Sequence, residues 1–243
     1  GNEARWAKSD ADAAAAKADL DRLLQRPLSP DDAVQIALVN NRGLQATYAE
    51  LGIAEADLVQ AGRLTNPQFA YLRTSDGQER KLEWALTFPI IDLLTLPLRT
   101  RIEGRRFEET KLAVAGATVG VALDTRRAWY DAVAAEEAVR YMEQVKSAAE
   151  AGAELARRMA GAGNFSRLAR MREQVFYAEV TTQLARTRQA AVSQRERLAR
   201  LMGLAGTERF ALPARLPELP SAPADAGELA SQLMERRYDV QAA

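Results

Sequence analysis

The longest pattern in this sequence is helical and runs from Leu98 to Met159 without a proline. At about 1.5 Å per residue, a helix of this length extends for about 93 Å. Its second half repeats apolar or small side chains at intervals of four and three residues, a heptad seam that lets partners approach closely. The members of this ladder are Ala134, Ala138, Tyr141, Val145, Ala148, Gly152, Leu155 and Met159. A chain with such a helix is expected to form an elongated, close-packed helical assembly.

A second helical run follows after a short break at residues 161–166 and extends from Arg167 to Met202. Gly161 and Gly163 can adopt the left-handed conformation that ends a helix, and Ser166 can cap the next one. The flanking helices, 42–63 and 167–202, together measure about 87 Å on the same scale. We therefore expect two shorter helices to lie antiparallel along the long one. A plain helical turn needs no more than these residues, but Phe165 and Leu168 then become apolar groups at an exposed tip.

The segment "TNPQFAYLRTSDGQERKLEWALTFP" changes from helical to alternating periodicity and predicts one antiparallel hairpin within residues 67–90. Its turn is expected at "SDGQ". In the second strand, one face is apolar, and its members are Leu82, Trp84, Leu86 and Phe88. The other face carries Lys81, Glu83, Ala85 and Thr87. An isolated hairpin is marginal in water, so another part of the molecule or other chains must complete it.

Composition excludes several classes of function. The chain has 33 basic and 33 acidic residues, which gives no indication of a nucleic-acid partner. It contains no cysteine and no histidine, so thiol nucleophiles, the usual zinc ligands and the common neutral-pH general base are absent. Neighbouring carboxylates such as Glu108–Glu109 and Glu136–Glu137 point about 100° apart on a helix and are interpreted as solvated faces. We expect no enzyme, no cofactor and no metal site.

The ends of the sequence have their own patterns. Ser29 is expected to cap a short helix that starts with Pro30 and ends near residues 40–43. Residues 207–227 contain four prolines and are interpreted as a surface linker. The stretch "ELASQLMERRYDVQAA" (228–243) aligns with "DAVQIALVNNRGLQAT" (32–47), which suggests that a second repeat begins there and that the native protein continues.

The order of these elements resembles the outer membrane efflux protein (TolC) family. The resemblance lies in "LSPDDAVQIALVNNRGLQA", "ADLVQAGRLTNPQF", "RRAWYDAVAAEEAV", "AGAGNFSRLARMREQ" and "RERLARLMGL", within residues 28–206. It implies a mainly α protein whose long antiparallel helices form an α-helical barrel, with the hairpin contributing to a transmembrane β-barrel. It also implies a homotrimer in the Gram-negative outer membrane, with most of the chain in the periplasm. Its expected partners are outer membrane lipid, a periplasmic adaptor and an inner-membrane efflux pump.

This interpretation divides the chain into eight segments. They are an N-terminal arm (1–28), a short helix plus first tunnel helix (29–66), membrane strands (67–90), a long tunnel helix (91–160), a periplasmic tip (161–166), a returning tunnel helix (167–206), a linker (207–227) and the start of a second repeat (228–243).

The same interpretation assigns two groups of site residues. The apolar strand residues face lipid, whereas Lys81, Glu83 and Thr87 face the lumen. The adaptor-docking tip consists of Gly161, Gly163, Asn164, Phe165, Ser166 and Leu168.

Two alternatives remain open at this stage. A periplasmic adaptor also projects a helical hairpin, and a soluble coiled-coil scaffold would make the strand alternation accidental.

The arginines of "RTRIEGRR" (99–106) either meet anionic headgroups, line a tunnel or merely solvate a helix end.

Overall fold

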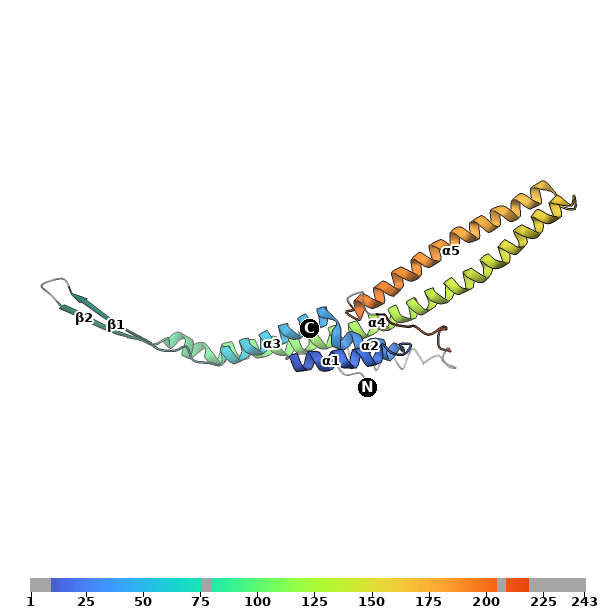
Figure 1. The fold of residues 1–243 in the computed structure, drawn as a ribbon. Coiled ribbons are helices and arrows are strands. Elements are labelled where there is room, and N and C mark those ends of the chain that lie inside the picture. The colour runs from blue at the N-terminus through green and yellow to red at the C-terminus, as the bar shows by residue number, and fades with distance from the viewer. Residues whose placement is uncertain (1–9, 76–79, 205–208, 219–243) are drawn as a thin grey trace, which may run out of the picture. The chain divides into compact units, whose positions relative to one another are not determined.

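The computed structural model describes residues 10–75, 80–204 and 209–218, with the side chains of 10–16, 75, 80 and 81 excepted. It is mainly helical with one two-stranded sheet, as expected from the sequence (Figure 1). The elements are α1 (Asp10–Leu23), α2 (Pro30–Asn40), α3 (Arg42–Ala61), β1 (Gln68–Ser75), β2 (Arg80–Thr87), α4 (Ile90–Gly161) and α5 (Arg167–Leu201). The expected second repeat at 228–243 and the turn at 76–79 lie outside the described residues.

The chain forms two compact units, which we describe separately. The hairpin unit is Ala46–Gly116 and contains most of α3, both strands and the first part of α4. The helical unit comprises the described residues through Gln45 and from Ala117 onward.

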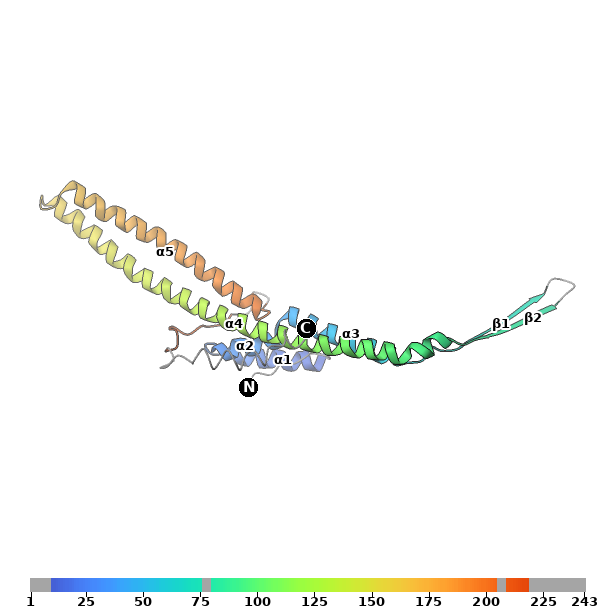
Figure 2. The same ribbon diagram turned by 180° about the vertical axis from the view of Figure 1, so that it is seen from behind.

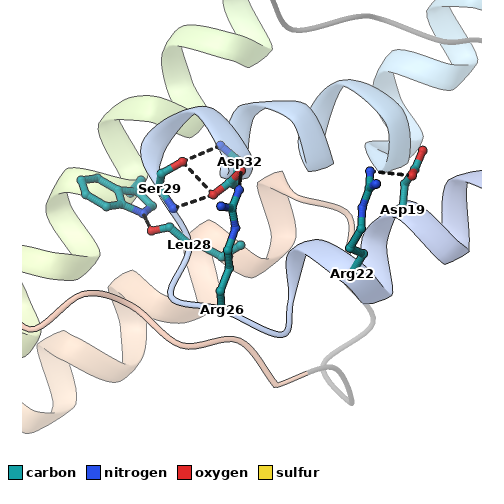
Figure 3. A network of polar contacts seen from close by, with 7 residues as sticks. Asp19, Arg22, Arg26, Leu28, Ser29 and Asp32 are labelled. Atoms are coloured by element: carbon teal, nitrogen blue, oxygen red, sulfur yellow. Dashed lines mark hydrogen bonds and ion pairs between the residues drawn. The ribbon is translucent and has the colours of Figure 1, made fainter.

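The start of α2 confirms the predicted cap. Ser29 Oγ accepts a hydrogen bond of 3.1 Å from the backbone N–H of Asp32, and the Asp32 carboxylate accepts one of 3.1 Å from the backbone N–H of Ser29 (Figure 3). Two otherwise unpaired helix donors are thereby satisfied, and Pro30 occupies the first turn, where no donor is needed. Arg26 adds a 2.8 Å ion pair to the same carboxylate.

The helical unit is built on α4 and α5, which run side by side in both views (Figures 1 and 2). Its core surrounds Trp129, which is fully buried and contacts small residues of α4 and the end of α5. Three leucines from α1 and the loop after it (Leu20, Leu23 and Leu24) pack against this core. The interpretation of residues 1–28 as an N-terminal arm therefore understated their role, because these leucines cover part of the core.

The face of α4 that packs toward α5 is not the predicted ladder. Ala149 and Ala156 are buried, whereas Tyr141 and Leu155 of the ladder are 64% and 59% exposed. Alanine occurs on both faces, so periodicity did not distinguish the two. In α5, by contrast, the buried residues Leu184, Ala191 and Leu198 recur at intervals of seven.

In the hairpin unit, α3 lies against the first part of α4. Thr100 Oγ1 donates a hydrogen bond of 3.3 Å to the carbonyl oxygen of Ala61, and a Cβ on Gly104 would lie 3.9 Å from the Leu58 side chain. The small residue Gly62 lies near Thr100, where a Cβ would be 3.9 Å from its hydroxyl. These small residues allow the two helices to approach closely.

The start of α4 differs from the prediction. The uninterrupted helical pattern was expected from Leu98, within a tunnel-helix segment assigned to 91–160, and the helix itself begins at Ile90 and contains Pro97. The Leu93 amide donates to the Pro89 carbonyl oxygen, and this bond closes the first turn of α4 before Pro97. Because Pro97 lies only in the second turn, the one backbone bond that it removes is near the helix end. Within the described ranges, no helix combines the length and apolar character needed to cross a bilayer.

Candidate functional site

The hairpin register places the side chains of both strands on two distinct faces. Tyr71 pairs with Trp84 and Phe69 pairs with Leu86, so these aromatic and aliphatic side chains share one face. Leu72 pairs with Glu83 on the other face. The second strand showed this division in its sequence, but the first strand did not, since Leu72 interrupts its alternation. The pairing shows that Phe69 and Tyr71 extend the apolar face, which also carries Arg73 opposite Leu82.

The apolar face is largely exposed in the described chain. Trp84 is 72% exposed, Leu82 60%, Leu86 53% and Phe88 60%. Phe69 and Tyr71 on β1 are similarly open, at 67% and 57%. Glu83 and Thr87 are exposed on the opposite face, and the Lys81 side chain is not described. Water is an unfavourable environment for an apolar surface of this kind, so a lipid or protein partner is expected to cover it.

The break between α4 and α5 is a tight helix-ending turn. The amide of Asn164 donates to the Met159 carbonyl oxygen at 2.9 Å, and that of Gly163 donates to Ala160 at 3.2 Å. This pair of bonds is a Schellman motif, and Gly163 supplies the left-handed residue with φ of 79°. Gly161 does not share this role, because it ends the helix without a positive φ. Ser166 Oγ then accepts from the Ala169 amide at 3.1 Å and starts α5.

Apolar side chains are exposed at this turn and along the start of α5. Leu168 is 61% exposed, and Phe165 is half-buried. Sequence reasoning missed Met171 and Val175, which are 48% and 56% exposed. Met171 follows Leu168 by three residues and Val175 follows Met171 by four, and this spacing could have revealed them, because it places all three on one helix face.

A charged cluster lies on the last two turns of α4 before the tip. Glu154 accepts hydrogen bonds from Arg157 at 2.7 and 2.8 Å and from Arg158 at 2.8 Å. The two Arg157 bonds, followed by the single Arg158 bond, lower the pKa of Glu154 to about 2. All three side chains are accessible, so this cluster keeps the sides of the tip polar and charged.

Two of the carboxylates that were interpreted as solvated faces have partners within the helical unit. Glu136 forms a 2.7 Å ion pair with Arg195 of α5, and Arg195 also donates to the carbonyl oxygen of Phe210. Glu137 accepts from the Leu216 amide at 3.4 Å. Glu136 and Glu137 are therefore not simply solvated; they hold the segment 209–218 on the helical unit. Among the described residues, no group of three or more Asp or Glu side chains is placed to hold a metal ion.

The fold and the hairpin can be compared with known proteins. No protein-family model matches the chain. A membrane protein from Pseudomonas aeruginosa has a similar structure, with a TM-score of 0.68, 20% identity and coverage of 93% of this chain and 54% of that chain. The Campylobacter jejuni outer membrane channel CmeC aligns with a TM-score of 0.66 and 14% identity over 88% of this chain and 52% of its own. In sequence, the cobalt-zinc-cadmium resistance protein CzcC of Cupriavidus metallidurans is 25% identical over 199 residues, 82% of this chain and 48% of CzcC.

The resemblance to the outer membrane efflux (TolC) family is confirmed. The likeness to the solved structures establishes the fold, and the chain spans about half the length of the curated relative that it matches. The names of these relatives describe a membrane protein, an outer membrane channel and a resistance protein, and none of them names an enzyme.

Proposed function

We propose that the chain is part of an outer membrane channel subunit that serves as a passive conduit in an efflux system. The observation that carries this proposal is the exposed apolar face of the hairpin, opposite a face that bears Glu83 and Thr87. A membrane strand alternates in this way, with one face toward lipid and the other toward a water-filled lumen. The residues assigned to lipid are Leu82, Trp84, Leu86 and Phe88, with Phe69 and Tyr71 added from β1.

Two strands leave unpaired backbone groups at both edges, and lipid offers no hydrogen bonds to satisfy them. We therefore propose a closed barrel assembled from several copies. The family pattern is a homotrimer with four strands per protomer, and β1 and β2 would supply two of the four. The helical unit would then lie in the periplasm as part of an α-helical tunnel.

We further propose that the tip docks on a periplasmic adaptor that connects the channel to an inner-membrane pump. Leu168, Met171 and Val175 form an exposed apolar strip that a partner helix can cover. The Schellman turn at Gly163 fixes the direction of the strip because it determines how α5 leaves α4. Phe165, half-buried beside Ser166, would form the edge of this contact.

The first experiment is cell fractionation of the intact protein in its native bacterium, with extraction by detergent and conductance measurements in a planar bilayer. We expect the protein in the outer membrane fraction, dependent on detergent for solubility and forming open pores. Recovery as a soluble protein without detergent would contradict the proposal and favour a coiled-coil scaffold. The name of the relative CzcC makes cobalt, zinc and cadmium ions the first substrates to test, by comparing the metal tolerance of a deletion strain with that of its complemented parent.

A further inference from the structure

The first turns of α4 expose a stripe of large apolar side chains beyond the hairpin. Ile90 is 65% exposed, Leu94 74% and Leu98 57%. Ile91 and Leu93 beside them are 76% and 54% exposed. Because residues four apart lie on the same helix face, Ile90, Leu94 and Leu98 form one stripe, which begins two residues after Phe88. Nothing in the described part of the hairpin unit covers it.

The same face becomes strongly basic within the next two turns. Arg101 and Arg105 follow Leu94 and Leu98 at intervals of seven residues and therefore lie on the same side of the helix. At about 1.5 Å per residue, they lie about 5 and 10 Å beyond Leu98 along the axis.

These two arginines differ from the arginines beside them. Arg99 lies 4.0 Å from the Asp92 carboxylate, and Arg106 forms a 3.1 Å bond with Glu103. Arg101 and Arg105 are exposed, and neither has an acidic partner within 4.0 Å in the described residues. Their guanidinium groups are free to bind an external anion.

We propose that this stripe lies at the periplasmic surface of the membrane, where Arg101 and Arg105 bind the phosphates of anionic phospholipids. The isoleucines and leucines would enter the boundary between headgroups and acyl chains, as the apolar face of an interfacial helix does. Arginine extends an apolar stem toward the headgroups and presents a planar fork that matches phosphate. A protein partner would need acidic residues opposite these arginines, whereas a bilayer supplies phosphates along its whole surface. The inference rests on the proposed function, because it assumes that the hairpin is in the membrane.

Spin labels can locate the stripe. The chain contains no cysteine, so Leu94→Cys and Tyr71→Cys in the intact protein each give a single labelling site. After reconstitution in phospholipid vesicles, both labels should be accessible to molecular oxygen, which concentrates in lipid, and shielded from a water-soluble nickel complex.

The two labels distinguish the possible failures. If the Tyr71 label is in lipid but the Leu94 label is shielded from both reagents, a second copy covers the stripe and the inference is wrong. If the Leu94 label is open to the nickel complex, the stripe faces water and the inference is also wrong. If the Tyr71 label is not in lipid, the proposed function itself fails.

Lipid selectivity tests the arginines. We expect Arg101→Gln with Arg105→Gln to lower the affinity for phosphatidylglycerol relative to phosphatidylcholine by about thirtyfold, since each basic residue near a membrane surface contributes about fivefold. Native mass spectrometry of the detergent-solubilised intact protein, titrated with each lipid, measures this ratio. The matched control is Arg172→Gln with Arg186→Gln on α5, which removes the same charge from exposed residues elsewhere and should leave the ratio unchanged.

Lysine replacements complete the series. Arg101→Lys with Arg105→Lys keeps both charges and should retain most of the preference for phosphatidylglycerol. The proposal is wrong if the double glutamine variant of Arg101 and Arg105 keeps the native ratio of phosphatidylglycerol to phosphatidylcholine affinity. It is also wrong if the α5 control variant lowers this ratio by the same factor.

Discussion

The indole Nε1 of Trp129 donates a hydrogen bond of 2.9 Å to the carbonyl oxygen of Leu28, which lies 101 positions earlier in the chain. Both residues are buried, at 2% and 1% exposure, and Leu28 directly precedes the cap residue Ser29. The bond therefore joins the entry to α2 to the middle of α4 and satisfies two buried polar groups. It holds together segments that are distant in sequence within the helical unit.

Trp129→Phe is expected to lower the free energy of unfolding by about 1–3 kcal/mol, because it leaves the buried Leu28 carbonyl oxygen without its donor. The measurement is denaturant unfolding of the intact protein in detergent, monitored by helical circular dichroism. The neighbour Tyr130 packs edge-on against Trp129 at 5.0 Å between ring centroids but is 40% exposed. Tyr130→Phe should change stability by no more than about 0.5 kcal/mol, and equal effects of the two changes would contradict this account.

The cap at Asp32 should make stability depend on pH in acid. Burial raises the pKa of Asp32, but the hydrogen bonds from Ser29 and the charge of Arg26 together outweigh burial, so the net pKa is below 3.8. Because the folded pKa is lowered, the stabilisation is complete only well above the ordinary aspartate pKa and is lost as the pH falls through the folded pKa. The stability difference between the native protein and Asp32→Asn should therefore shrink as the pH falls below 3.8. A difference that stays constant through this range would show that the charge of Asp32 does not matter.

Gly203 occupies a position that only glycine fits. Its φ is 69°, and a Cβ would overlap the carbonyl group of Asn40, whose side-chain amide bonds the Gly203 carbonyl oxygen at 2.9 Å. Gly203→Ala should cost about 2–4 kcal/mol from left-handed strain and overpacking together. The control is Gly120→Ala on α4, where a Cβ meets nothing within 4 Å and helix propensity should raise stability by about 0.5–1 kcal/mol. Thermal unfolding of both variants measures the difference between their stability changes. If both substitutions destabilise the protein, the explanation from the Gly203 backbone is wrong.

Local signals in the sequence were sufficient to predict the helix cap, the hairpin and the tip turn. Ser29 and Pro30, the alternation of β2, and Gly163 with Ser166 each act through backbone geometry within a few residues. The start of α4 was wrong because a proline was taken as a boundary, although Pro97 is tolerated near a helix end. The buried face of α4 is determined by which alanines pack against α5. The sequence alone does not predict this, because alanines occur on more than one face of α4. The exposed strip of Met171 and Val175 was visible in the spacing but was not recognised.

The two faces of the hairpin give a matched test of the membrane assignment. Tyr71 and Leu72 are neighbours with nearly equal exposure, 57% and 59%, but they lie on opposite faces. Tyr71→Arg should impair membrane assembly of the intact protein by about 2–4 kcal/mol if the residue lies near the midplane, because arginine would then face lipid. Leu72→Arg places the same charge beside Glu83 on the proposed lumen face and should assemble normally. Heat-resistant oligomer on semi-native gels measures assembly, and equal impairment by both variants would mean that the faces are assigned wrongly.

The tip should be the region where function is most sensitive to a single charge. Leu168→Asp introduces a carboxylate at an exposed position in the first turn of α5, where the helix dipole tolerates an acid, so folding should survive. Docking would bury that carboxylate without a partner, which is costly, so adaptor binding and export should fail. Gly163→Val should act differently, because a β-branched residue resists a φ of 79° and would strain the turn itself. Oligomer formation, adaptor cross-linking and export by both variants of the intact protein separate these effects. If Leu168→Asp cross-links and exports like the native protein, the segment is only a turn between two helices.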